Sequence, residues 1–390
     1  MAKKRRKVNT KRIAILVLIP IVCVGLLIAN MTNIRLSIKG YDRAAKKIVL
    51  KLDSEEIHDI LNCDHVIDIA KWDKVKNNSH YVLYDKYYRM TKYKTSKVVY
   101  FVDAYYERME DLNYLGYTTN FLFKNSDLYT INTLDTLISS NIPYEKTKKY
   151  LAVKGAQICD IKDYVDSELS PLKAVLKVSY PGIDSSKRNS RTYTILSPED
   201  TLALIKNGFS VGSDYEPSDL RKVNIPYESE AGKLRDEAAT ALEKMYKDGL
   251  KEGYDIVIKS SYRSYEKQKA VYDEYFATHD ADYATNLVAV PGSSERQCGL
   301  SVDLTSQGVM DGIYGTFGET PDYEWVKKNA YKYGFVLRFP ENASDKTGAT
   351  NEPWHFRYVG KKVAKEIYDK DWVLEDYIQY HGFTYNMRLN

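Results

Sequence analysis

A chain of 390 residues is long enough to bury at least one large core and to fold as more than one unit. Its 57 basic and 53 acidic residues leave a net charge of +4 and are interspersed along the sequence. A nucleic-acid-binding domain usually gathers its basic residues on one face, so we expect no nucleic-acid partner.

The N-terminus carries a basic run followed by an apolar stretch. Lysines and arginines fill positions 3–7, a pattern that also occurs in nuclear addresses. From Ile13 to Ala29 every residue is apolar except one proline and one glycine. Such a stretch, with cations before it, predicts a transmembrane helix over residues 13–30. Residues 1–12 are then a cytoplasmic tail, and the rest of the chain lies outside the cytoplasm.

A cleaved signal peptide has the same polarity and is the alternative. Its apolar region is usually only about 7 to 15 residues long and is followed by small residues at the cleavage site. The end of the apolar stretch here, Leu27 to Met31, matches that pattern poorly. We therefore favour an uncleaved anchor and predict a single-pass membrane protein.

Residues 31–225 form a region rich in tyrosine and lysine. They contain no long glycine, serine or proline tract, which predicts a folded, mixed but largely helical region instead of a flexible stalk. The run Val98–Val102 is typical of a buried strand. Two similar segments, Leu52–Leu61 and Leu196–Ile205, each begin with a capping residue followed by acidic residues. They are either two ordinary capped helices or a repeat, and the role of the region stays open.

The cysteines suggest no covalent framework. Cys23 falls in the predicted span, and Cys63, Cys159 and Cys298 follow it. Three cysteines cannot all pair within the chain, and their spacings match no zinc or disulfide pattern. We expect unpaired, buried thiols.

Residues 226–390 alternate helical and strand patterns, which predicts an α+β domain with a small sheet. We expect a first helix that begins near Ser229 and is ended by Gly249 and Gly253, a second over residues 265–278, and a third that Thr320 caps and that begins at Pro321. We expect strands over residues 254–260 and 335–339, and a short strand that ends near Asp303.

Three side chains in this domain have the chemistry of a metal hydrolase site. Such a site needs protein ligands from His, Asp or Glu, an open position for water, and a carboxylate that moves protons. His355 can supply a ligand, and Glu352, three residues earlier, can supply the carboxylate. Trp354 between them can pack beneath, and Asp303 offers a hard oxygen ligand. Taken alone, the Glu-x-x-His pattern is weak.

The pattern extends much further along the chain, from about Tyr215 to Gly382. It includes Ser260-Ser261-Tyr262-Arg263-Ser264 with Gln268, Pro291-Gly292 with Ser294-Glu295, Gln297, Gly299-Leu300, Val302-Asp303, Tyr333-Gly334-Phe335, Arg338, Lys346-Thr347-Gly348 and Glu352-Pro353-Trp354-His355 with Arg357. In these residues the chain resembles the VanY-type D-alanyl-D-alanine carboxypeptidases, zinc peptidases of the bacterial cell wall that share a fold with the hedgehog signalling domain. The resemblance implies a small antiparallel sheet flanked by helices.

The resemblance also implies a function and roles for individual residues. The substrate would be the D-Ala-D-Ala end of peptidoglycan stem peptides, hydrolysed at an extracytoplasmic site of a bacterial cell membrane. Asp303 and His355 would hold zinc, and Glu352 would be the general base that accepts a proton from the zinc-bound water. Arg263 would lie near the substrate. The residues that would line the cleft are Gln268, Ser294, Ser301 and Trp354.

The chain departs from the family at the remaining ligand position, where a histidine is replaced by Arg296. A guanidinium has no free lone pair and stays protonated, so it cannot bind zinc. Cys298 or Glu295 would be the substitute ligand if one exists. Otherwise Arg296 pairs with Asp303 or Glu352 and fills the place of the metal. The protein would then be a pseudoenzyme that binds peptidoglycan or a partner, so two functions stay open.

Overall fold

The computed structural model describes residues 31–126, 130–181, 183, 191–229, 232–278 and 288–390. The chain divides into two compact units, Met1–Ser126 and Asp127–Asn390. The second unit begins well before the domain boundary expected at residue 226, which stays a prediction.

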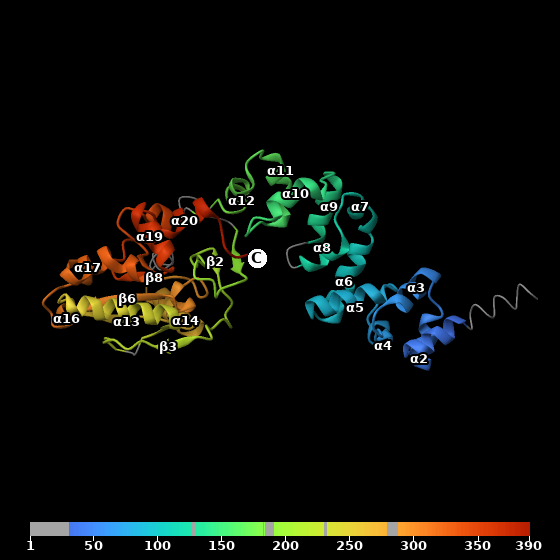
Figure 1. Ribbon diagram of the computed structural model, residues 1–390, viewed down its shortest axis with the longest axis horizontal. Coiled ribbons are helices and arrows are strands. Elements are labelled where there is room, and N and C mark those ends of the chain that lie inside the picture. Colours follow the sequence, from blue (N-terminus) through green and yellow to red (C-terminus); the bar gives the residue numbers. More distant parts are fainter. Residues whose placement is uncertain (1–30, 127–129, 182, 184–190, 230–231, 279–287) are drawn as a thin grey trace, which may run out of the picture. The chain divides into compact units, whose positions relative to one another are not determined.

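The described part of the first unit is helical. Its aromatic core explains why the region is rich in tyrosine: Trp72, Tyr84 and Tyr87 are at most 1% exposed. Tyr87 stacks on Phe101 with 4.8 Å between ring centroids. The helices are α2 (Arg43–Val49), α3 (Ser54–Asn62), α4 (Ile69–Asp73), α5 (Tyr81–Thr91), α6 (Thr95–Tyr106), α7 (Met109–Tyr114) and α8 (Thr119–Lys124) (Figure 1).

Two expectations for residues 31–225 are wrong. The run Val98–Val102 lies inside helix α6, where Val98, Val99 and Val102 are buried. A short apolar run cannot be assigned to strand or helix by periodicity alone, and here the packing against α5 decides. Residues 54–62 do form a capped helix, with Asp53 accepting from the backbone N–H groups of Glu55 and Glu56. Residues 196–205, by contrast, form turns.

The second unit begins with four helices and a small three-stranded sheet. The helices are α9 (Ile131–Ser139), α10 (Tyr144–Leu151), α11 (Ile161–Asp166) and α12 (Pro171–Ser179). Strand β1 (Tyr193–Ile195) pairs with β2 (Phe209–Ser210) and with β9 (Met387–Leu389), near the end of the chain. This pairing joins the helical segment to the C-terminal region in one unit.

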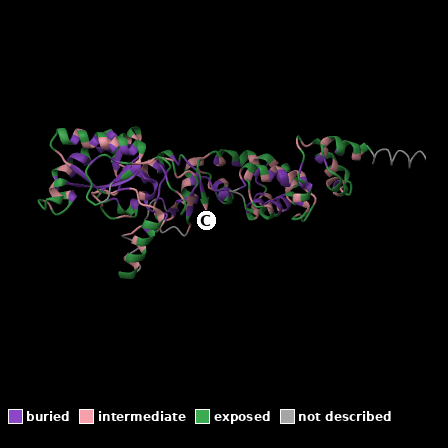
Figure 2. Ribbon diagram, turned by 90° about the horizontal axis from the view of Figure 1, so that it is seen from below, coloured by how far each residue is buried: buried purple, intermediate pink, exposed green. Residues whose placement is uncertain are grey.

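The central sheet is antiparallel, in the order β5-β6-β8-β7. Its strands are β5 (Ile256–Ser260), β6 (Ser301–Ser306), β7 (Phe335–Leu337) and β8 (His355–Tyr358). Every residue of β6 and β8 is buried, as the purple core in Figure 2 shows. Asp303 lies in the middle of β6, not at a strand end as expected, and is paired with His355 of β8.

Helices flank this sheet, as Figure 1 shows. Helix α13 begins at Asp236 instead of near Ser229, because residues 233–235 form strand β4, which pairs with β3. The remaining elements are β3 (Leu220–Lys222), β4 (Lys233–Arg235), α13 (Asp236–Lys251), α14 (Tyr265–Thr278), α16 (Gln307–Met310), α17 (Pro321–Asn329), α18 (Ser344–Thr347), α19 (Lys361–Asp369) and α20 (Leu374–His381).

The prediction of a transmembrane helix needs correction. Among the residues that the structure describes, no helix is long and apolar enough to cross a membrane. Helix α13, for example, has 16 residues and carries charges along its length, whereas a span needs about 20 mostly apolar residues. This finding contradicts the single-pass anchor and the membrane localisation inferred from it. The predicted span itself, residues 13–30, and the tail before it lie outside the described residues.

A buried network of charges connects the central sheet to helix α20. The Arg338 guanidinium donates to Glu295 at 2.8 Å and to both carboxylate oxygens of Glu375 at 2.8 and 2.9 Å. Lys206 reaches Glu375 at 3.2 Å, and Arg357 lies 3.2 Å from Glu295. The side chains of Arg338, Glu295 and Glu375 are at most 3% exposed, so each charge depends on the others for solvation.

We expect Arg338→Met to destabilise the second unit by about 3 kcal/mol, because it leaves two buried carboxylates without their main partner. Chemical denaturation followed by tryptophan fluorescence measures this change. Arg388→Met at an exposed position is the matched control and should change stability by no more than about 0.5 kcal/mol. If both variants lower the free energy of unfolding by the same amount, the buried charge network does not stabilise the second unit as proposed.

Candidate active site

The pairing of β6 with β8 brings two predicted zinc ligands together. Asp303 and His355 are directly opposite each other in the antiparallel register. The Nδ1 atom of His355 lies 2.8 Å from Oδ1 of Asp303. Both side chains are almost fully buried, with 8% and 2% exposed. The strand pairing therefore places both groups without help from a ligand.

Glu352 joins them from the turn that leads into β8. Its backbone N–H donates to the Phe339 carbonyl, and its own carbonyl accepts from the N–H of His355, each at 3.0 Å. The carboxylate oxygen Oε2 lies 3.7 Å from His355 Nδ1. Burial raises the pKa of Glu352, although His355 and Arg296 oppose the shift. Glu352, Asp303 and His355 thus converge on one point, and their roles stay predictions.

Arg296 occupies that point. It lies on the 3-10 turn Glu295–Cys298, and its Nη2 donates to both oxygens of Asp303, at 2.8 and 2.6 Å, while Nε donates to Oδ2 at 3.1 Å. The same Nη2 lies 3.2 Å from His355 Nδ1. Burial works to lower the pKa of Arg296, but Asp303 more than offsets it and the net shift is upward. The guanidinium is therefore charged and bound to the groups that would hold a metal.

The Nδ1 atom of His355, which faces Asp303 and Arg296, offers no free lone pair. Burial alone would lower its pKa, but hydrogen bonds to Asp303 and Glu295 raise it overall. In the protonated ring, Nδ1–H donates to Asp303. In the neutral ring with a bare Nδ1, that nitrogen accepts from Arg296. Either way the Nδ1 lone pair is used within the protein.

These residues do not fit a zinc ion. Zinc needs three protein atoms that donate lone pairs at about 2.0 to 2.3 Å. Here one of the three positions is the cation Arg296, which is bonded to Asp303 and lies against His355 at the other two. Neither proposed substitute ligand takes over. The thiol of Cys298 is fully buried and donates to the Glu295 carbonyl at 2.9 Å. The Glu295 carboxylate is held by Arg338 and Arg357, which keep its pKa well below the usual range despite burial.

Arg263 lies beside this group. Its backbone N–H donates to the Arg296 carbonyl at 3.1 Å, and its guanidinium donates to Gln268 at 3.1 Å and to Ser260 at 3.3 Å. Burial and the nearby charge of Arg296 lower the pKa of Arg263, and Asp303 only partly opposes this. Arg263 and Arg296 therefore both interact with the buried carboxylate of Asp303.

The other predicted site residues differ in how far they are buried and in whether they have a hydrogen-bond partner. Gln268 is buried and links Arg263 to the Ala289 carbonyl, to which its Nε2 donates at 2.8 Å. Ser294 is 3% exposed and its hydroxyl has no protein partner. Ser301 is fully buried in β6, and Trp354 is half-buried just before β8. Their roles in binding a substrate stay predictions.

Sequence reasoning missed the charges that lie behind the site. Arg338 and Arg357 were noted only as matching positions, yet both contact Glu295, the residue before Arg296. Charged residues inside otherwise apolar strand segments are a signal of buried pairing, because an unpaired charge is rarely buried.

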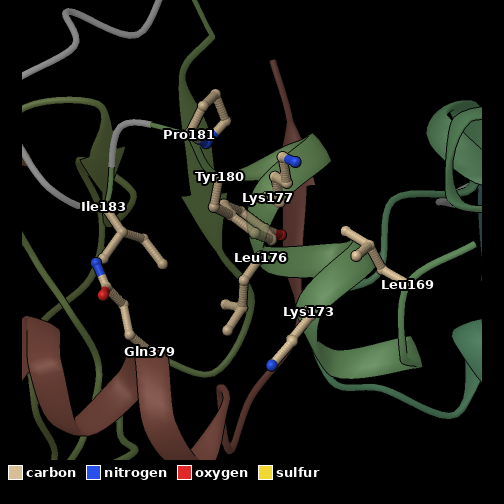
Figure 3. Close-up of a pocket in the computed structure, with 8 residues that line it drawn as sticks. All are labelled: Leu169, Lys173, Leu176, Lys177, Tyr180, Pro181, Ile183 and Gln379. Carbon is tan, nitrogen blue, oxygen red and sulfur yellow. The ribbon is translucent and has the colours of Figure 1, made fainter. Parts of the chain in front are cut away.

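A cavity of about 420 Å³ lies elsewhere in the second unit, beside α12 and α20 (Figure 3). None of the site residues described above lines it, so it does not extend the site. Its lining combines apolar side chains with two lysines and one amide: Leu169, Lys173, Leu176, Lys177, Tyr180, Pro181, Ile183 and Gln379.

The C-terminal region is similar to known carboxypeptidases. The family model described as "VanY: D-alanyl-D-alanine carboxypeptidase" matches residues 231–361. The putative carboxypeptidase YodJ of Bacillus subtilis is 44% identical over 190 residues, which cover 48% of this chain and 70% of that protein. A D-alanyl-D-alanine carboxypeptidase of Enterococcus faecalis is 30% identical over 225 residues, 54% of this chain and 80% of that protein. The chain belongs to the VanY family.

This membership confirms the resemblance seen in the sequence. VanY-family proteins are D,D-carboxypeptidases of the metallopeptidase class, and the family is zinc-dependent. A solved structure of the vancomycin-resistance D,D-pentapeptidase VanY, a mutant in complex with Zn(II), is 32% identical, covers 46% of this chain and 98% of that chain, and has a TM-score of 0.38. The family is zinc-dependent, whereas in this chain Arg296 forms an ion pair with Asp303.

We expect Arg296→His to bind one more equivalent of zinc than the native chain, because it adds a lone-pair donor and releases Asp303 and His355. Metal analysis after dialysis against zinc measures the difference. The matched control is Arg296→Gln, which also breaks the ion pair but supplies no imidazole and should gain no zinc. If the native chain binds zinc and His355→Ala loses it, the conclusion that these residues do not fit a zinc ion is wrong.

Proposed function

We propose that the second unit binds the D-Ala-D-Ala end of peptidoglycan stem peptides without hydrolysing it. The observation that carries this proposal is the bond of Arg296 to both oxygens of Asp303, with His355 Nδ1 3.2 Å away. The VanY family membership supplies the substrate class, and the D-alanyl-D-alanine carboxypeptidase of E. faecalis is named for it.

Hydrolysis lacks its nucleophile in this arrangement. Free water has a pKa of about 15.7, and a bound metal is what brings that value near 7 in zinc enzymes. The carboxylate of Glu352 is present and its pKa is raised, which suits a general base. A base alone, however, cannot generate hydroxide at neutral pH or polarise the scissile carbonyl.

Binding, by contrast, has what it needs. Arg263 uses only part of its donor set on Gln268 and Ser260, and its pKa is lowered partly because Arg296 is close. An anion between the two guanidinium groups would relieve their mutual repulsion. The terminal carboxylate of a stem peptide is such an anion, and planar guanidinium groups bind carboxylates well.

We expect isothermal titration to show that the full chain binds a synthetic stem pentapeptide ending in D-Ala-D-Ala, with equal affinity in the presence and absence of EDTA. Arg263→Ala should weaken binding at least about 10-fold, because hydrogen bonds to charged groups contribute about 1.5 to 3 kcal/mol. Arg388→Ala, an exposed arginine of the same unit, is the control and should bind as the native chain does.

A D-alanine release assay on the same samples decides between binding and hydrolysis. The native chain should release no D-alanine above the buffer control, with or without added zinc. Release that EDTA abolishes would overturn the proposal and make the chain a VanY-type hydrolase. Absence of both release and binding would remove the stem peptide as its ligand.

A further inference from the structure

A second group of metal-binding side chains lies in the first unit, between helices α3 and α4 (Figure 1). It consists of three consecutive residues, Cys63, Asp64 and His65, whose donor atoms all lie within 4.8 Å of one another. The Cys63 sulfur is 3.6 Å from His65 Nδ1 and 3.9 Å from the Asp64 carboxylate. Asp64 also contacts His65 Nδ1 directly. The loop therefore gathers a thiol, a carboxylate and an imidazole at one point.

The spacings suit a tetrahedral zinc ion. With Zn–S near 2.3 Å and Zn–N near 2.0 Å, the two donor atoms of a tetrahedral site lie about 3.5 Å apart. Sulfur lies almost equally far from both ring nitrogens, at 3.6 and 3.7 Å. Only the sulfur–nitrogen spacing fits as it stands: zinc binding needs the half-buried Cys63 side chain to rotate toward Nδ1 and the exposed Asp64 carboxylate to move away from that nitrogen. A thiolate and a carboxylate together neutralise the charge of the ion.

The histidine is already oriented by a second carboxylate. His65 Nε2 lies 2.7 Å from Oδ2 of Asp85, a nearly buried residue of helix α5. This bond makes Nε2 a donor to Asp85. Nδ1 contacts the Asp64 carboxylate, which can only accept, so a zinc ion has to displace the Nδ1 proton to bind there. Histidine ligands of metals usually have such a carboxylate or carbonyl behind them. Asp85 is itself held by Arg89 at 2.7 Å.

The backbone of the loop is held on both sides. Lys39 donates to the carbonyls of Leu61 and Cys63, and the Tyr41 hydroxyl accepts from the Ile67 N–H at 3.1 Å. The nearest cations, Lys39 and Arg89, are thus bound to carbonyls and to Asp85. A loop fixed in this way loses little entropy when it binds an ion.

We propose that Cys63, Asp64 and His65 form a zinc site with water in the fourth position. Binding releases the thiol proton of Cys63 and the Nδ1 proton of His65, and it joins the end of α3, through His65 and Asp85, to α5. Because the site is in the first unit, it is independent of the peptidase region. The ion stabilises the first unit by binding its folded form.

The test measures zinc affinity of the full chain by competition with a chromogenic chelator, together with the absorption of the cobalt(II) form. We expect one zinc per native chain and a thiolate-to-cobalt charge-transfer band. Cys63→Ser should lose both, and Asp85→Asn should weaken zinc about 10- to 100-fold. Cys159→Ser, at an exposed cysteine, and His355→Ala, in the second unit, are controls that should keep the site.

Alkylation of the native chain supplies a readout that needs no variant. Zinc should protect Cys63 from iodoacetamide, as mapped by mass spectrometry, and leave the reaction of Cys159 unchanged. Lack of stoichiometric zinc, zinc retained by Cys63→Ser, or unprotected Cys63 would each overturn the proposal. Zinc lost on His355→Ala but kept by Cys63→Ser would place the ion in the peptidase region instead.

Discussion

The bonds that Arg338 makes to Glu295 and Glu375 hold the site region together. They join the end of β7, the turn before β6 and helix α20 inside a part of the molecule that water does not reach. Because Glu295 is held inward by Arg338 and Arg357, the next residue of the same tight turn is presented to Asp303 and His355. Whatever side chain stands at position 296 therefore reaches the centre of the site.

In this chain that side chain is an arginine, and its charge replaces a metal without replacing its chemistry. A guanidinium can neutralise Asp303 and keep it buried, so the pKa of Asp303 falls to about 2 in spite of burial. It has no empty orbital to bind water and no lone pair to give. The Glu352 carboxylate remains 3.7 Å from His355, and the guanidinium stands where the family would hold its metal.

The site around Asp303 and the loop at Cys63, Asp64 and His65 differ in what occupies their metal-ligating atoms. At Asp303 and His355 the acceptors are already satisfied by a donor that cannot leave. At Cys63, Asp64 and His65 the groups that hold Asp64 are a thiol and an imidazole, which can give up a proton to an incoming metal ion, and Asp85 orients the imidazole from its other nitrogen. Metal-ligating atoms that are not paired with a fixed cation can bind a divalent ion, whereas atoms already paired with one exclude it.

The sequence alone determined the family, the α+β character of the C-terminal region, helices such as the one that Thr320 caps, and the identity of the converging residues. It could do so because motif residues, caps and turns are local signals. It misassigned Val98–Val102, because a short apolar run takes its structure from what packs on it, and the start of α13, because residues 233–235 pair with β3. Only the tertiary structure decided that Arg296 pairs with Asp303, that Cys298 and Glu295 are held by other groups, and that His65 is hydrogen-bonded to Asp85. Each depends on contacts between segments far apart in the chain, which no local pattern encodes.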